Sequence, residues 1–375
     1  MGTFFCGYCG KELISSQIEY CPYCGKQITD FTKSSSEDLE LYTNSSFKSY
    51  VNNYVGNTNK GGLNWKVLFS DIFKKHSVDE AEKIFISGTK STTPSVEDIS
   101  KEWIRPWLYF RVFLTFLATY VILYLGCTIF NNINLLPGLI FIGAMIVPIS
   151  SVMLFTELNI WRNVSVFRIF QTFLIGGCAS LFITLLLFSF ITPESLDYSG
   201  AFLVGAVEEI GKALIIYTFL KQMRSDKILV GLLIGCTIGA GFAAFETAGY
   251  GLRMMIIDGW ESMTQTLFLR NILTPGGHVA WGAITGAAIS IACKGGFCID
   301  NIFSTKFFRL FIIPIILHFI WDSPISGIGQ DYFLVYIILI IVVWTFLLSI
   351  INLGLSEIDI KQNIINPLNH YENLS

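Results

Sequence analysis

The distribution of apolar residues divides the chain into a polar first hundred residues and a long apolar remainder. Between residues 106 and 355, apolar residues gather in blocks of about 20, the length that an α-helix needs to cross the hydrocarbon core of a bilayer. These blocks lie at about residues 108–130, 135–155, 168–191, 199–220, 228–251, 269–293, 307–323 and 332–353. The pattern therefore predicts an all-α polytopic membrane protein with about eight transmembrane helices.

The composition supports this class. Of the 375 residues, 53% are hydrophobic and 14% are charged, whereas soluble domains carry roughly 25% charged residues. The formal net charge is −3 and no basic cluster is present, so nothing in the sequence predicts binding to nucleic acid. The first residues show no signal-peptide pattern, and we expect the first spanning helix to direct insertion into the membrane.

The polar first hundred residues begin with two C-x2-C pairs, each followed by glycine. The pairs are Cys6 with Cys9 and Cys21 with Cys24. Four thiolates on two tight turns are typical of a closed, tetrahedral Zn²⁺ site, which is structural rather than catalytic. A pair of redox disulfides is the alternative. We expect residues 1–28 to form a zinc ribbon that lies in the reducing cytosol.

Further boundaries follow from changes in composition. Residues 29–62 are rich in Ser, Asn and Gly and predict a flexible linker. Residues 63–105 predict short cytosolic juxtamembrane helices, one of which opens with a capping box at 77–80. Residues 106–355 form the membrane domain, and residues 356–375 predict a cytosolic tail.

The loops between the apolar blocks indicate an orientation, because positively charged residues are enriched on the cytosolic side. Loops assigned to the cytosol contain Arg162, Arg168, Lys221, Arg224, Lys227, Lys294, Lys306 and Arg309. Loops assigned to the outside contain only Arg253 and Arg270. We therefore expect a multi-pass protein of the cell membrane with both termini in the cytosol.

Four consecutive blocks contain ionisable residues in their interiors. These residues are Glu208, Glu209 and Lys212 in the fourth block, Glu246 in the fifth, His278 in the sixth, and His318 and Asp322 in the seventh. A charge at the centre of a bilayer costs at least ~2.5 kcal/mol, so such residues face a protein interior and usually mark function. They are the candidate site residues.

Spacing along the predicted helices relates these residues to each other. Glu208 with Lys212, and His318 with Asp322, stand four residues apart and can pair on one helix face. At ~1.5 Å per residue, Glu209 lies about 15 Å from the outer end of its block, His278 about 12 Å, and Glu246 and His318 about 6–8 Å. Carboxylates, imidazoles and a cation at such similar depths are the components of a hydrolytic site in the outer half of the membrane.

Other interpretations of these residues remain open. Each histidine alone could be a hydrogen-bonded core residue, and the Glu–Lys pair alone could serve packing specificity. The same groups could form the pathway of an ion- or proton-coupled transporter, although no inverted repeat with matching broken segments is visible. Three other kinds of intramembrane protease are excluded, because the chain lacks H-E-x-x-H, G-x-S-G and a pair of aspartates in mid-span.

The order of the motifs resembles the PrsW family of intramembrane proteases, which are related to CAAX prenyl endopeptidases and bacteriocin-processing CPBP proteins. The resemblance rests on Glu208-Glu209-x-x-Lys212, on Phe242, Glu246 and Tyr250, on a lone His278, and on His318-x-x-x-Asp322. It implies an endopeptidase domain over 106–355, a membrane-anchored protein as substrate, and Glu208, Glu209 and His278 as the essential residues. It also implies site-one cleavage of a membrane-anchored anti-sigma factor as the best-known activity.

Two mechanisms are consistent with these residues. In the first, glutamates and histidines bind a catalytic metal ion whose water attacks the peptide bond, as the classification of PrsW proteins with metalloproteases implies. In the second, a buried glutamate activates water directly, while His278 or His318 stabilises the oxyanion. The absence of a recognised zinc spacing favours the metal-free mechanism.

Overall fold

The structure is a computed structural model, and it describes residues 4–6, 12–13, 31–33, 47–57, 63–99, 105–327 and 332–372. The chain divides into two compact units, Met1–Tyr54 and Val55–Ser375. The division falls within the predicted linker.

The first unit contains a small antiparallel sheet in the order β2-β1-β3. Its strands are β1 (Phe4–Cys6), β2 (Glu12–Leu13) and β3 (Phe31–Lys33). Of the four predicted zinc ligands, Cys9, Cys21 and Cys24 lie outside the described residues. Cys6 ends β1, but its side chain is not described. The zinc ribbon and its Zn²⁺ therefore stay predictions.

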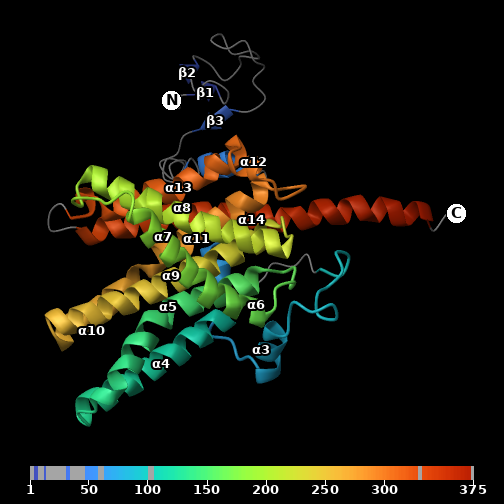
Figure 1. Ribbon diagram of the computed structural model, residues 1–375. Helices are drawn as coiled ribbons and strands as arrows, with labels where there is room; N and C mark the ends of the chain where they lie inside the picture. Colours follow the sequence, from blue (N-terminus) through green and yellow to red (C-terminus); the bar gives the residue numbers. More distant parts are fainter. Residues whose placement is uncertain are drawn as a thin grey trace. The chain divides into compact units, whose positions relative to one another are not determined.

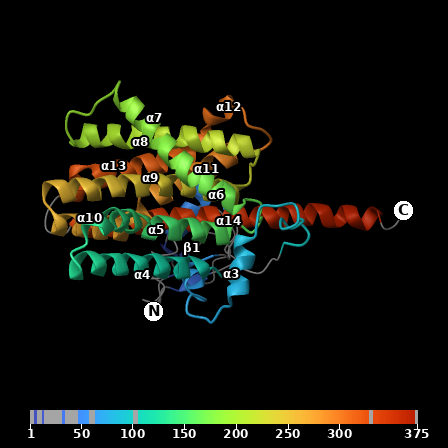
Figure 2. The ribbon, with the colours of Figure 1, turned by 60° about the horizontal axis from the view of Figure 1, so that its bottom comes forward.

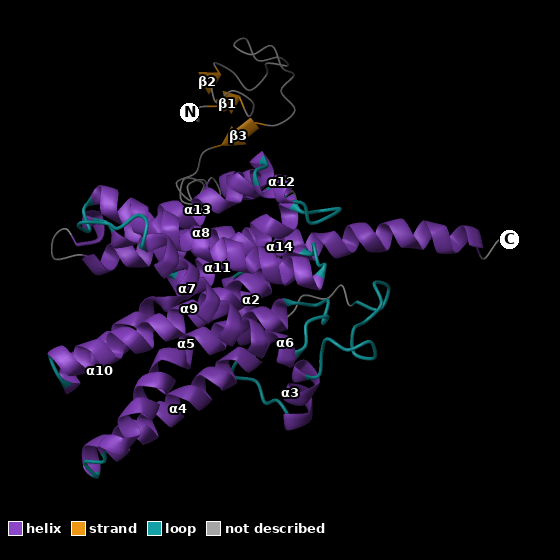
Figure 3. Cartoon of the chain, viewed as in Figure 1, coloured by secondary structure: helices purple, strands orange, loops and turns teal. Residues whose placement is uncertain are grey.

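The regular elements in the described residues of the second unit are all helices, joined by loops (Figures 1 and 3). Its elements are α2 (Trp65–Leu68), α3 (Val78–Phe85), α4 (Leu108–Ile129), η1 (Ile133–Leu135), α5 (Leu136–Leu158), α6 (Val166–Gln171), η2 (Thr172–Gly176), α7 (Gly177–Phe188), α8 (Tyr198–Met223), α9 (Ile228–Ile257), α10 (Trp260–Leu273), η3 (Thr274–Gly276), α11 (His278–Ala292), α12 (Ile299–Ile302), α13 (Thr305–Asp322), η4 (Pro324–Gly327) and α14 (Tyr332–Glu372).

The predicted apolar blocks coincide with these helices, but not all of them qualify as membrane spans by length and composition. Five segments do so in the described part of the chain: Leu108–Ile129, Ile133–Leu158, Val166–Phe188, Ile228–Ile257 and Phe333–Ile358. Helix α8 carries two glutamates and a lysine near its centre, α13 contains Lys306, Arg309 and Asp322, and α11 has only 15 residues. The count of eight spans therefore stays a prediction.

One predicted element differs from the structure. The sequence predicts the block 269–293 as one span, but it contains the end of α10, the η3 turn and α11, because Pro275 and two glycines interrupt the helix. Helix α14 continues to Glu372, so it includes most of residues 356–375, whose assignment as a cytosolic tail stays a prediction. The capping box at the start of α3 is confirmed, with Glu80 N–H donating to Ser77 Oγ over 3.2 Å.

Helix α9 lies at the centre of the second unit. Figure 2 shows it between α8 and α5, with α4 outermost beyond α5. Glycines let α9 and α11 approach until their backbones touch: a Cβ at Gly235 would lie 2.0 Å from the carbonyl oxygen of Gly282, and one at Gly286 would lie 2.0 Å from that of Gly231. Small residues at spacings of four are typical of such close helix pairs in membranes.

Helix α4 is attached to the rest of the unit by a carboxylate from α5. Glu157 accepts hydrogen bonds from the backbone N–H groups of Trp107 and Leu108, both at 2.9 Å, and of Tyr109 at 2.8 Å. The start of α4 has no side-chain cap of its own, so Glu157 satisfies N–H groups that would otherwise lack partners. This glutamate fixes where α4 begins relative to α5.

Candidate active site

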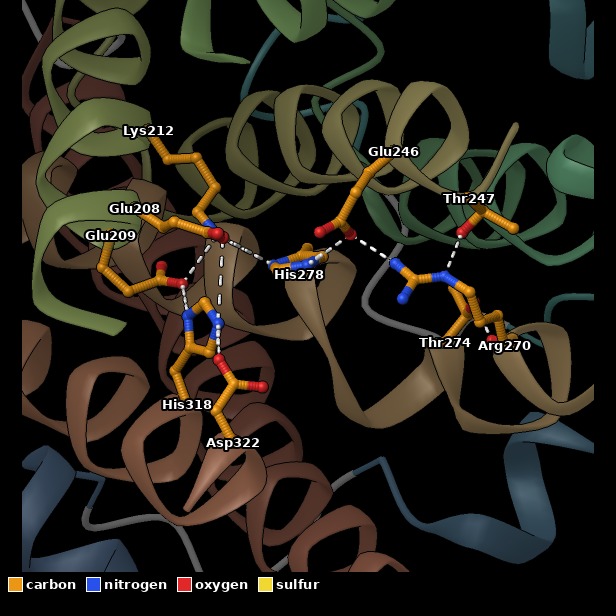
Figure 4. A network of polar contacts seen from close by, with 10 residues as sticks. All are labelled: Glu208, Glu209, Lys212, Glu246, Thr247, Arg270, Thr274, His278, His318 and Asp322. Atoms are coloured by element: carbon orange, nitrogen blue, oxygen red, sulfur yellow. Dashed lines mark hydrogen bonds and ion pairs between the residues drawn. The ribbon is translucent and has the colours of Figure 1, made fainter. Parts of the chain in front are cut away.

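The seven ionisable residues predicted from the sequence come together between α8, α9, α11 and α13 (Figure 4). A cavity of about 440 Å³ opens at this point. Five of the seven residues line it: Glu208, Glu246, His278, His318 and Asp322. The other two, Glu209 and Lys212, are fully buried behind the cavity wall. The structure thus assigns the two adjacent glutamates to different environments.

Lys212 pairs with a different glutamate from the one that the spacing predicted. Its Nζ lies 2.7 Å from Glu209 Oε1 and 3.8 Å from Glu208 Oε2. The i,i+3 contact to Glu209 therefore replaces the predicted i,i+4 pair as the short one. The lysine also lies 4.5 Å from the centre of the Phe242 ring, which adds a cation–π contact. These contacts compensate a fully buried ammonium group.

His318 on α13 is held between two carboxylates. Its Nδ1–H donates to Glu209 Oε1 over 2.9 Å, because a carboxylate oxygen can only accept. Its Nε2 lies 3.2 Å from Asp322 Oδ2, so the predicted i,i+4 pair is present. The indole ring of Trp281 stacks on the imidazole at 4.3 Å between ring centres. The ring is thus fixed on three sides.

His278 is the first residue of α11 and is also bonded at both nitrogens. Lys212 Nζ donates to Nδ1 over 2.9 Å, since an ammonium group has no lone pair. Nδ1 must then be unprotonated, and Nε2–H donates to Glu246 Oε2 over 3.1 Å. Lysine and glutamate together determine the tautomer of His278, with the lone pair on Nδ1.

The sequence analysis missed Arg270, which it assigned to an outer loop. The residue lies in α10, where its guanidinium donates to Glu246 Oε2 and, over 2.9 Å, to Thr247 Oγ1. It also stacks over the Tyr250 ring at 4.5 Å. A glutamate inside a span requires a cationic partner, and the position of Arg270 two helical turns before His278 was the available signal.

Glu208 differs from Glu209 because it lines the cavity. Its Oε2 is buried and, like Oε2 of Glu209, accepts no hydrogen bond from any described residue. This oxygen lies 4.0 Å from His278 Nδ1 and 3.8 Å from His318 Nε2. One ligand atom from each of these three residues fits within 4.8 Å of the others. A carboxylate oxygen and two imidazole nitrogens are a typical donor set for catalytic Zn²⁺, so the residues fit a divalent metal ion.

Glycines determine the positions of both histidines. A Cβ at Gly239 of α9 would lie 2.1 Å from the carbonyl oxygen of His278, and one at Gly205 of α8 would lie 3.3 Å from the Cβ of His318. Any larger side chain at Gly239 must push α11 away, because the nearest atom belongs to the backbone. The spacing of the site therefore depends on residues with no side chain.

Fold and site together define a polytopic membrane protein with a Glu/His cluster enclosed by its helices. Residues 166–348 match the family model described as PrsW family intramembrane metalloprotease. Over these residues the chain is similar to the PrsW family, and the resemblance found in the motifs is confirmed. No curated protein and no solved structure gives a significant match.

The family supports a membrane protease, and it gives no support to the alternative of an ion- or proton-coupled transporter. The match includes the complete cluster of Glu208, Glu209, Lys212, Glu246, His278, His318 and Asp322, together with Arg270. It also suggests a metal ion, for which the three residues around Glu208 Oε2 have suitable ligand atoms.

Proposed function

We propose that the chain is an intramembrane endopeptidase that hydrolyses a peptide bond of a membrane-anchored protein in or near the outer half of the bilayer. The observation that carries this proposal is Oε2 of Glu208, which accepts no hydrogen bond from the described residues and faces two imidazoles at the wall of the cavity. A buried carboxylate oxygen without a hydrogen bond costs free energy, and a function or an absent ligand explains why a protein keeps one. Water, or a metal ion with its water, is the ligand that this position suits.

In this proposal Glu208, His278 through Nδ1 and His318 through Nε2 would hold a divalent metal ion, and Nε2 would lose its proton and its contact with Asp322 Oδ2 when the ion binds. When bound, the ion supplies a Lewis acid that polarises the scissile carbonyl group and activates water. The surrounding residues orient the ligands: Glu246 holds the Nε2–H of His278, and Glu209 holds the Nδ1–H of His318. Carboxylates in this position fix the tautomer of a metal-binding histidine and raise its basicity.

Access to the cavity supports a reaction near the outer side. Leu196, which precedes α8, and Tyr250, near the end of α9, both line the cavity. The predicted orientation places these two ends of the helices outside, with both chain termini in the cytosol. A membrane-anchored anti-sigma factor, the substrate implied by the family resemblance, is our candidate. The protease domain is residues 106–355, and the zinc ribbon is an accessory with a structural Zn²⁺.

The proposal is tested by cleavage of a co-expressed single-span substrate. We expect His278→Ala and His318→Ala each to reduce cleavage by about 10²-fold or more, since each removes a proposed ligand. His76→Ala, which changes a histidine outside the apolar blocks, is the matched control and should cleave normally. Mass spectrometry of the products should place the cut near the outer end of the substrate span. Normal cleavage by both site variants would refute the proposal.

A further inference from the structure

The side chain of Lys212 occupies the same nitrogen of His278 that the proposed metal ion requires. His278 Nδ1 lies 4.0 Å from Glu208 Oε2, and Lys212 Nζ lies 2.9 Å from the same nitrogen. The other ring nitrogen is bonded to Glu246 Oε2. His278 therefore offers one lone pair, and the ammonium group already uses it.

Lys212 has the position and the charge of a bound cation. Its Nζ contacts Glu209 Oε1 at 2.7 Å and lies 3.8 Å from Glu208 Oε2. The group is completely buried, so solvent does not screen its charge from a neighbouring ion. An ammonium group and a divalent ion at this nitrogen exclude each other by contact and repel each other by charge.

We infer that Lys212 is an internal competitor for the metal site, and that a metal ion binds only when Lys212 releases His278. The inference rests on the proposed function, because it takes Glu208, His278 and His318 as the ligands. Glu209 Oε1 stays within reach of the ammonium group after release, so the lysine need not be left unpaired. Lys212 would then hold the ligands in place before the metal arrives, at the expense of metal affinity.

Metal affinity measures this competition without reference to proteolysis. The full chain, purified in detergent with Cys6→Ser and Cys9→Ser to remove the predicted ribbon site, is titrated with Co²⁺ while its visible absorption is recorded. We expect Lys212→Met to lower the dissociation constant by about tenfold or more. The repulsion between two positive charges a few ångström apart inside a protein exceeds the free energy that corresponds to a tenfold change in dissociation constant. Lys221→Met is the matched control. It makes the same substitution at an exposed lysine of the same helix that lies over the Tyr217 ring and contacts none of the proposed ligands, and it should change affinity by less than about threefold.

A second variant distinguishes two effects of Lys212 on metal binding: its occupation of His278 Nδ1 and its positive charge. Lys212→Met combined with Glu209→Gln removes one charge of each sign, and the amide oxygen of the glutamine can still accept from His318 Nδ1–H. It also avoids the unpaired buried carboxylate that could prevent folding of the single variant. We expect this double variant, too, to bind Co²⁺ about tenfold more tightly than the background protein.

The outcomes distinguish the inference from the proposed function. If the background protein binds one Co²⁺ ion that Glu208→Gln abolishes, but neither Lys212 variant binds it more tightly, the metal site stands and the competition is wrong. If neither the background protein nor either Lys212 variant binds Co²⁺, both the metal site and the competition are wrong. Tighter binding in both Lys212 variants, with little change in Lys221→Met, would establish the competition.

Discussion

Helices α4 and α9 have nearly the same apolar composition but opposite surroundings. In the most apolar stretch of α9, 94% of the residues are buried, against 6% in α4. Leucine, isoleucine and phenylalanine dominate α4, whereas α9 alternates them with glycines that face α7 and α11. Hydropathy identifies both helices as membrane spans, but only the small residues show which one lies at the centre.

The difference has a functional consequence, because the ionisable residues of the site lie on or beside the helix that makes close glycine contacts. Helix α9 carries Glu246 and touches the backbone of His278 through Gly239. Helix α4 has one ionisable residue besides its tyrosines and cysteine, Arg111, near its start. Close backbone contact gives side chains on adjacent helices the short distances that the site requires, and a helix that faces lipid cannot provide them.

The largest effect is expected from a substitution that disrupts a glycine contact of α9. We expect Gly239→Ala to reduce cleavage by about 10²-fold, because its Cβ would meet the carbonyl oxygen of His278 at 2.1 Å and must displace α11. Gly249→Ala changes the same helix where no atom lies within 4 Å, and its cleavage should stay near that of the unchanged protein. Equal activity of the two variants would contradict the role of backbone contact.

A smaller effect is expected when an isoleucine is replaced by alanine in each of the two helices and the free energies of unfolding are compared. Ile238 in α9 is fully buried, whereas Ile122 in α4 is 68% exposed. Ile238→Ala should lower the free energy of unfolding by roughly 2–5 kcal/mol, the usual cost of a cavity in a core. Ile122→Ala should change it by at most about 0.5 kcal/mol. Chemical unfolding in detergent measures both values, and a similar loss in the two variants would show that α4 is not peripheral.

The smallest effect concerns the attachment of α4. Glu157→Gln removes the charge that accepts three backbone N–H groups, and it should lower the free energy of unfolding by about 1–3 kcal/mol. The exposed Glu97 provides the control, since Glu97→Gln should have almost no effect. Because Glu157 lies outside the site, the protein that remains folded should cleave its substrate at the normal rate. A large loss of cleavage without loss of stability would be unexpected.

Much of the fold could be predicted because helix length in a membrane is set by the bilayer. Helical segments cover each predicted block, but the block 269–293 is divided before His278 by Pro275 and its neighbouring glycines. The number of spans could not be settled in the same way. Helix α9 qualifies as a span, whereas α8 and α13 carry charges and α11 is short, so three of the four helices that form the site do not resemble ordinary spans.

The candidate site was predictable in its members but not in its contacts. Helical spacing identified the His318–Asp322 pair, yet it favoured Glu208 over Glu209 as the partner of Lys212. Positions three and four residues away lie on the same face of a helix, so only packing against α11 and α13 decides between them. Arg270 was missed because the inclusion of α10 in the site depends on tertiary structure.

The two glutamates of α8 therefore have separate roles in this account. Glu209 contacts Lys212 and His318 behind the cavity wall, where it positions other residues. Glu208 lines the cavity, where its Oε2 lies 4.0 Å from His278 Nδ1 and 3.8 Å from His318 Nε2. Replacing each glutamate by glutamine should distinguish the residue that takes part in the reaction from the residue that positions others. Glu209→Gln should lower the melting temperature, because it removes a negative charge that pairs with Lys212.

The most direct test is the rate at which purified Glu208→Gln, reconstituted in lipid nanodiscs, cleaves a single-span substrate at saturating concentration. The account predicts a fall of about 10²-fold or more in the cleavage rate with an unchanged or higher melting temperature, because a reacting group is lost while the charge on a buried carboxylate without a hydrogen bond from the described residues is removed. Glu194→Gln, in the loop before α8, is the matched control and should react normally. Cleavage by Glu208→Gln within about threefold of the unchanged protein would contradict the central claim.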